Sequence, residues 1–341
     1  MLRHTITMTL FLTASFAQAG TVDVEDILST YNGVTSGDFN SSQEVEGRLF
    51  VGGNLTGTQI QTGFVSQLPA GPDQNVVVLG DTTIGKISGR GDLLIGGDAN
   101  TNIEQSGGTL TTLVGGTFSG LDNFGSVTDG LAGDPTFDSQ FPQIDFDGII
   151  AYSAYLSGLT GEDLVFNDPN QKRFDALNNA VQSEGENWDA ASVTILNTSI
   201  DQLSGGTFLT DVSMTETIIV NVSGTSGTYS LNAGVSKDVS QRILWNFYEA
   251  ETVQLNSAIF GSVLAPNATL SGFTGSAEGS ILAEIINLQN GELHSMPFEG
   301  DLPDIPSTEI VTSVPLPAGL PLLLTGFAGL VLARRWAKRA V

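Results

Sequence analysis

Carboxylates are the residues of this sequence best suited to chemistry. Asp81, Asp92 and Asp98 flank adjacent short apolar runs and could line one edge of the fold, and Lys86 and Arg90 lie between them. Carboxylates beside a base could cleave a polysaccharide, because such enzymes use Asp and Glu for acid–base work. Backbone preferences at turns also favour Asp after Gly, so no catalytic role is needed to explain them. We expect no catalytic residue, and a β-helical lyase or glycosidase is the alternative.

Nucleophilic catalysis lacks its usual parts. The sequence has no cysteine and no G-x-S-x-G motif, and its two histidines are His4, near the start, and His294. A Ser-His-Asp or Cys-His mechanism needs a nucleophile activated by a held imidazole. A structural hydrogen bond of His294 is therefore the expected role.

A calcium site is the alternative to having no cofactor. Asp134, Asp138, Asp145 and Asp147 lie near one another and offer oxygen ligands. The calcium-loop motif D-x-[DN]-x-[DN]-G is absent. A solvated helix face with its caps explains the four residues equally well, and we predict no cofactor and no metal ligand.

The charge excludes one class of partner. The net charge is −25, and all 37 acidic residues fall between Asp23 and Glu309. Such a surface repels nucleic acid and anionic lipid. No nucleic-acid partner is expected, whereas an extracellular glycan or protein ligand is compatible.

Short apolar runs that end in glycine recur through the first third of the chain. They are Leu49–Asn54, Val76–Asp81, Leu93–Asp98 and Thr112–Thr117. Short strands closed by tight turns at irregular intervals near 20 residues favour a β-solenoid. A sandwich of hairpins is the competing fold, but its N-G and D-G turn signals do not recur.

The middle of the chain changes period. Apolar residues at 146, 149, 150, 152, 155 and 156 predict an amphipathic helix that Asp145 or Asp147 caps and Gly158 ends. A second, weaker helix is predicted over Gln171–Gln182. Further strands are predicted over Val193–Leu196, Thr217–Val222, Thr228–Leu231, Ile243–Asn246, Val253–Leu255, Ala258–Val263 and Gly279–Ile286.

Both ends of the chain carry export signals. Arg3, an apolar stretch over Ile6–Phe16 and the motif Ala17-Gln18-Ala19 predict a signal peptide cleaved before Gly20. Near the other end, Gly319–Trp336 would form a helix roughly 27 Å long, close to the ~30 Å apolar core of a bilayer. Arg334 and Arg335 would hold the tail in the cytoplasm.

Two blocks carry a family likeness. Asp38–Gly57, with E-G-R-L-F-V-G-G-N-L, and Gly261–Pro303, with L-A-P-N-A-T-L, resemble the two ends of the choice-of-anchor A domain, a bacterial surface domain. The resemblance implies a β-solenoid with a helix packed alongside, similar in style to ice-binding and adhesin domains.

The closing segment resembles a sorting signal. Val314, Pro315, Leu316, Pro317 and Ala318 match the VPLPA variant of the PEP-CTERM class, followed by an apolar span and basic residues. The resemblance implies processing by signal peptidase and an exosortase-like transpeptidase of Gram-negative bacteria.

These observations predict four segments in a mainly β protein with a C-terminal transmembrane helix. They are a signal peptide at 1–19, a solenoid domain at 20–300 with a helical insert at about 140–185, a linker at 301–313 and a sorting signal at 314–341. The expected function is non-enzymatic adhesion or a matrix role, at the inner membrane during sorting and then at the cell surface. Threonine-rich stretches such as Thr109–Thr112 keep ice or mineral binding as a further alternative.

Overall fold

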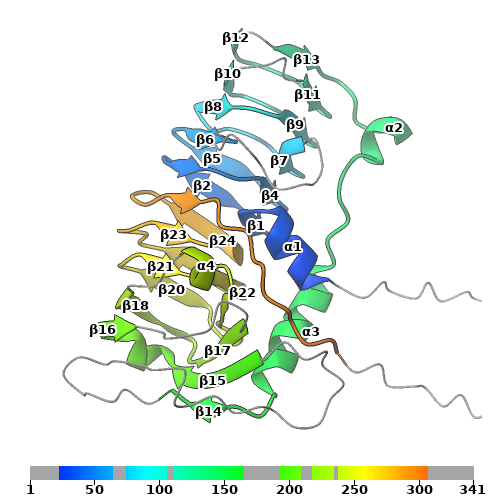
Figure 1. The fold of residues 1–341 in the computed structure, drawn as a ribbon. Coiled ribbons are helices and arrows are strands. Elements are labelled where there is room, and N and C mark those ends of the chain that lie inside the picture. Colours follow the sequence, from blue (N-terminus) through cyan, green and yellow to red (C-terminus); the bar gives the residue numbers. More distant parts are fainter. Residues whose placement is uncertain are drawn as a thin grey trace, which may run out of the picture. The chain divides into compact units, whose positions relative to one another are not determined.

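The strands form a parallel β-solenoid, in which stacked coils present three faces. A computed structural model describes residues 23–63, 74–105, 111–123, 125–164, 193–208, 217–233 and 237–305. Every strand pairing within these ranges is parallel (Figure 1). The chain is therefore mainly β, consistent with the predicted solenoid. The sandwich of hairpins is wrong, because hairpins pair their strands antiparallel.

The first face runs the length of the stack. From one end to the other its strands are β13 (Ser126–Thr128), β11 (Thr111–Val114), β9 (Asp92–Ile95), β7 (Gln74–Val78), β4 (Leu49–Val51), β1 (Gly33–Thr35), β24 (Ile281–Leu288), β22 (Ser262–Ser271), β19 (Ile243–Asn246), β17 (Thr217–Ser223), β15 (Val193–Ser199) and β14 (Glu162–Asp163).

The second and third faces complete each coil. The second face consists of β5 (Leu55–Gly57), β2 (Phe39–Ser41), the C-terminal parts of β24 and β22, β20 (Thr252–Leu255), β18 (Ser226–Ala233) and β16 (Ser204–Phe208). The third face consists of β12 (Asp122–Asn123), β10 (Asn102–Gln105), β8 (Lys86–Gly89), β6 (Ile60–Thr62), β3 (Glu44–Val45), β25 (Leu293–His294), β23 (Ala277–Glu278) and β21 (Ile259–Phe260).

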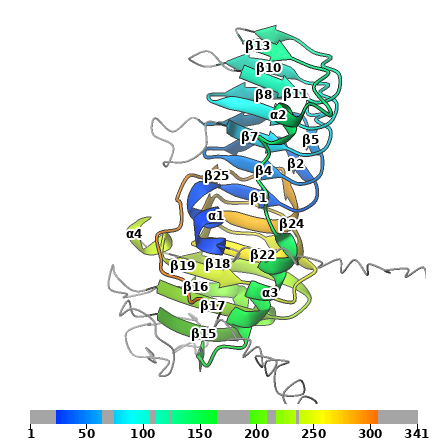
Figure 2. The same cartoon turned by 90° about the vertical axis from the view of Figure 1, so that its right-hand side faces the viewer.

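The coils do not follow one another in chain order. The chain enters the middle of the stack at β1 and climbs to β13. It then returns along the first face and resumes at the opposite end with β14 and β15 (Figures 1 and 2). Its last coils climb back until β24 pairs with β1, with Gly33 opposite Ile281. We call this contact between the two halves of the solenoid the seam.

Within the described ranges, four helices accompany the strands. They are α1 (Val24–Thr30), α2 (Pro135–Asp138), α3 (Phe146–Ser157) and α4 (Lys237–Ser240), and a 3₁₀ turn covers Ile200–Leu203. Helices α1, α2 and α3 lie against the first face (Figure 2). Strands of this face such as β4, β7 and β19 are consequently buried on both sides, which explains their uninterrupted apolar runs.

Two apolar layers hold this arrangement together. Inside the solenoid, residues such as Leu49, Val51 and Trp245 form one cluster. Outside the first face, Phe50 and Leu94 pack with residues of the helices in a second cluster. Most of the apolar residues predicted to form one face of the helix over 146–156 thus pack in this second layer.

The predicted central helix is confirmed at both ends. The Asp145 side chain accepts a hydrogen bond from the backbone N–H of Gly148 at 3.0 Å, and Gly158 is the C-terminal cap. The helix predicted over 171–182 lies outside the described residues. One strand prediction is corrected, because Ala258–Val263 is split by a corner at Gly261 between β21 and β22.

Among the described residues, no helix combines the length and apolar character needed to cross a membrane. The predicted membrane helix at 319–336 lies outside those residues, as do the signal-peptide residues and the sorting motif, namely Ala17, Ala19, Gly20, Val314, Pro315, Leu316, Pro317, Ala318, Arg334 and Arg335.

Candidate functional site

Two of the carboxylates considered for catalysis, Asp81 and Asp98, belong to a structural ladder at one corner of the solenoid. The Asp81 carboxylate accepts the backbone N–H of Asp98 at 2.8 Å, and the Asp98 carboxylate accepts the N–H of Thr117 at 2.7 Å. Asp38 and Asn54 continue the ladder by accepting the N–H of the corresponding residue one coil further on. Each side chain thus satisfies a backbone donor of the next coil.

The electrostatics of the ladder follow from these bonds. Hydrogen bonds from the Thr117 backbone and hydroxyl lower the pKa of the Asp98 carboxyl below its ordinary value. A carboxylate stabilised in its charged form in this way is a poor general acid. The ladder therefore favours a structural role for Asp98.

The glycine pairs beside the ladder are required by close approach. A Cβ on Gly97 would collide with the Asp81 carboxylate, and one on Gly116 with that of Asp98. The Gly-Gly pairs in the sequence thus mark positions where the backbone of one coil contacts a side chain of the preceding coil.

The other residues considered for catalysis lie elsewhere. Asp92 is the first residue of strand β9, whereas Asp98 follows the end of that strand. The Asp92 carboxylate accepts the N–H of Thr111 at 2.9 Å. Lys86 belongs to the third face, where its ammonium is 3.3 Å from Glu104. The expectation that Asp81, Asp92 and Asp98 line one edge is therefore wrong, because the corner carries only two of them.

The four aspartates considered for calcium are placed at helix starts. The Asp134 carboxylate caps α2 through the N–H of Thr136 at 2.8 Å, and Asp145 caps α3. Asp138 and Asp147 lie within the first turns of these two helices. Within the described ranges, no group of three or more His, Cys, Asp or Glu residues is arranged to hold a metal ion.

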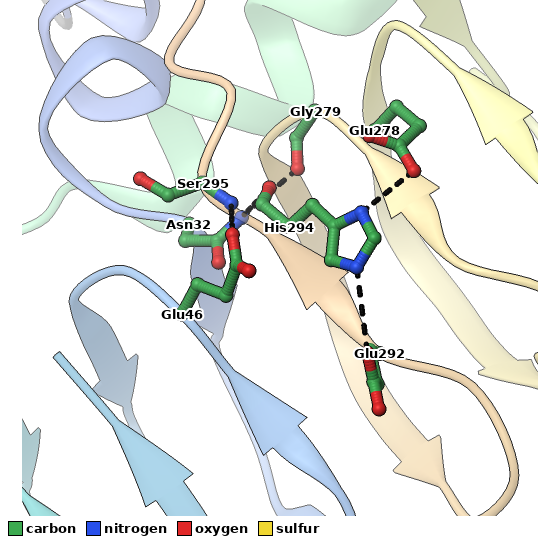
Figure 3. A network of polar contacts seen from close by, with 7 residues as sticks. All are labelled: Asn32, Glu46, Glu278, Gly279, Glu292, His294 and Ser295. Carbon is green, nitrogen blue, oxygen red and sulfur yellow. Dashed lines mark hydrogen bonds and ion pairs between the residues drawn. The ribbon is translucent and has the colours of Figure 1, made fainter. Parts of the chain in front are cut away.

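A group of titratable side chains lies on the third face at the seam (Figure 3). The His294 Nδ1 atom is 2.7 Å from Glu278 Oε1, and its Nε2 atom is 3.4 Å from Glu292 Oε2. Across the seam, Glu46 Oε2 accepts the N–H of Ser295 at 2.8 Å. Pairing of Leu293 with Val45 brings Glu44 beside Glu292. We call Glu44, Glu46, Glu278, Glu292 and His294 the seam cluster.

Asn32 holds the strands beneath this cluster. Its side-chain amide donates to the carbonyl oxygens of Gly279 and His294 at 3.0 Å each and accepts the N–H of Gly47 at 3.1 Å. The residue is only 4% exposed. One side chain therefore links two late coils to an early one.

The carboxylates set the charge of the imidazole. Burial opposes protonation of His294, but Glu278, Glu46 and Glu292 together raise its pKa above the ordinary value. Burial and the neighbouring Glu292 and Glu46 raise the pKa of Glu44, an effect that His294 partly offsets. Because carboxylates face both ring nitrogens, the arrangement favours an ion-paired imidazole over a free general base.

This geometry predicts that His294 stabilises the protein only at low pH. Its raised folded pKa means that its contribution is complete below the unfolded pKa of about 6.5 and disappears as the pH rises through the folded value. The ring is partly exposed, so the contribution stays below about 1 kcal/mol.

Urea unfolding of wild type and His294→Gln at pH 5.5 and pH 8.5 measures this contribution. The variant is expected to be the less stable at pH 5.5 and to match wild type at pH 8.5. A stability gap that widens toward pH 8.5 contradicts the assignment.

Sequence reasoning identified His294 as a structural residue but missed the role of Asn32, Asp38 and the four glutamates. The glycine-polar repeat contains a signal for the ladder, because the last position of all four runs is Asn, Asp or Thr. No comparable signal marks Asn32, whose partners are 247 and 262 residues away.

Comparison with known proteins identifies the family. No curated protein and no solved structure matches the chain. A family model described as "Putative Ice-binding-like adhesive domain" matches residues 24–295, which include every strand of the described solenoid. The chain therefore belongs to this family of ice-binding-like adhesive domains.

Proposed function

We propose that the protein is a non-enzymatic, surface-displayed adhesin. The observation that carries the proposal is the adhesive-domain match, which extends over both halves of the solenoid. A stack of coils presents the same side-chain positions again and again on its outer faces. Binding by repeated weak contacts suits such a surface, and the protein would act outside the cell or on its surface.

The carboxylate geometry supports display over catalysis. Asp81 and Asp98 are engaged with backbone donors, and Lys86 lies on a different face. A polysaccharide-active enzyme is tested directly by Asp81→Asn and Asp98→Asn. Turnover of acidic glycans that either change abolishes would contradict the non-enzymatic proposal.

Anchoring completes the proposal. The choice-of-anchor A likeness and the VPLPA-type tail make signal peptidase and an exosortase-like transpeptidase the processing partners, in a Gram-negative bacterium. The domain would be held at the inner membrane during sorting and then be released to the cell surface or matrix.

Mass spectrometry of the C-terminus after cell fractionation tests this route. Loss of the residues that follow the Val314–Ala318 region is the expected result. A surface protein that retains Arg334–Val341 contradicts processing by a transpeptidase and indicates a permanent helical anchor. Adhesion itself is tested separately, by attachment of beads coated with the full-length chain to glycan-coated and protein-coated surfaces.

A further inference from the structure

An unbroken row of uncharged polar side chains follows the second face across both halves of the solenoid. Bridges of Thr82 to Leu55 and Ala99, and of Ala99 to Phe118, set the register in the early coils. Asn40 lies opposite Asn287 at the seam. The row consists of Ser119, Asn100, Thr83, Thr56, Asn40, Asn287, Ser271, Gln254 and Thr228.

These side chains point away from the core. Their neighbours along each strand, such as Leu55 and Ile286, are fully buried, and residues alternate between the two sides of a strand. Thr83, Asn100 and Gln254 are exposed. Some members bond along the row, as the Asn40 amide does by donating to the Thr56 hydroxyl at 2.7 Å. We call these nine residues the uncharged row.

The row contrasts with the charge of the molecule. None of its nine members is charged, although the chain carries a net charge of −25. In the late coils the adjoining outward positions, Thr269 and Thr252, are also uncharged. In the early coils the adjoining positions belong to the structural ladder, whose aspartate carboxylates accept backbone N–H groups. The acidic border disfavours an anionic occupant.

The described ends of the domain lie beside the first face. Phe298 donates its N–H to Leu28 of α1 at 3.2 Å, and the Tyr152 hydroxyl of α3 donates to the Pro303 carbonyl at 2.8 Å. The chain therefore enters and leaves the domain beside the helices on the first face (Figure 2).

We propose that the uncharged row binds a neutral polysaccharide chain lying along the solenoid axis, an assignment that rests on the proposed adhesive function. Hydroxyl and amide groups both donate and accept hydrogen bonds, as sugar hydroxyls do. Coils stacked about 4.8 Å apart repeat these groups at a regular spacing that a periodic polymer can follow. No charge on the row has to be desolvated on binding.

Affinity would accumulate along the row. A single hydrogen bond exchanged with water contributes about 1 kcal/mol or less, so a short oligosaccharide binds weakly and a long chain binds well. This length dependence separates the row from a compact sugar pocket, which would be saturated by a few residues.

Co-sedimentation of the full-length chain with microcrystalline cellulose and with chitin, in detergent, tests the proposal. Alginate serves as the anionic comparison. Thr83→Glu/Gln254→Glu places one carboxylate on the row in each half of the solenoid. Gln61→Glu/Asn123→Glu adds the same charge on the third face and is the matched control.

The wild type is expected to bind at least one of the two neutral polymers, and the row variant to bind it at least about tenfold more weakly, a loss of ~1.4 kcal/mol. The control is expected to stay within about twofold of wild type. A single cooperative urea transition in each of the three proteins shows that the row variant is folded, and Thr56→Glu repeats the test with a single change.

Four results would overturn the inference. They are undiminished binding by the row variants, binding to alginate or to a cationic polymer alone, no binding to either neutral polymer, and inhibition of ice growth that the row variants lose without any polysaccharide binding. If the coated beads still attach to other surfaces, only this inference fails. Beads that attach to no surface remove the adhesive function itself.

Discussion

Asn32→Ala is expected to lower the free energy of unfolding by about 3 kcal/mol, because several buried polar groups lose their partner at once. The carbonyl oxygens of Gly279 and His294 and the N–H of Gly47 all depend on this amide. The Asn32 side chain connects coils that are far apart in sequence. Its loss therefore weakens the seam specifically.

Urea unfolding at constant pH measures this loss, with Asn123→Ala as the matched control on an exposed part of the third face. The control is expected to stay within about 0.5 kcal/mol of wild type. Hydrogen exchange adds a local readout, in which the amides of β1 and β24 exchange faster in Asn32→Ala. A destabilisation below about 1 kcal/mol, or faster exchange confined to the ends of the stack, would contradict a clamp at the seam.

Asn246→Leu is expected to loosen α3 from the first face and to cost about 2–4 kcal/mol. Asn246 accepts the Ser153 hydroxyl at 2.6 Å and donates to the Ser153 carbonyl and to the Asn221 side chain, both at 2.9 Å. Asn221 in turn donates to the Leu156 carbonyl at 2.9 Å. Leucine has a similar volume but leaves these buried groups unpaired.

A double-mutant cycle with Ser153→Ala isolates the contact between helix and solenoid. Because the two residues share a hydrogen bond, the double variant is expected to be about 1 kcal/mol more stable than the sum of the single changes predicts. Exchange of the α3 amides is expected to accelerate in Asn246→Leu. Additive single changes, or unchanged exchange in α3, would show that the helix is held by its apolar side chains alone.

The contacts behind these predictions differ in how far they can be predicted from the sequence. The existence and ends of α3 were predictable, because the apolar period and the Asp145 cap act within a few residues of one another. The amide contacts beneath it were not, since Asn221 and Asn246 are aligned by strand pairing across separate coils. Capping is local chemistry, whereas register depends on which strand becomes the neighbour.

The candidate sites divide in the same way. The glycine-polar repeat predicted turns and coils correctly, and it contained the ladder residues Asn54, Asp81 and Asp98 but not Asp38. The grouping of Asp92 with Asp81 and Asp98 was wrong, because sequence proximity does not say at which corner of a coil a residue lies. The seam cluster combines β3 with β23 and β25, and no spacing in the sequence predicts that those strands meet.

The sequence by itself determined the mainly β class of the protein and its local elements: apolar runs for parallel strands, a capped helix, glycine-marked turns and a strongly acidic composition. These properties depend on neighbouring residues and on composition. Only the tertiary structure decided the order of the coils, the seam, and the continuous uncharged row. The physical reason is that the solenoid closes through contacts between residues about 250 positions apart. Such contacts become favourable only when both halves are already folded and stacked, so no local pattern records them.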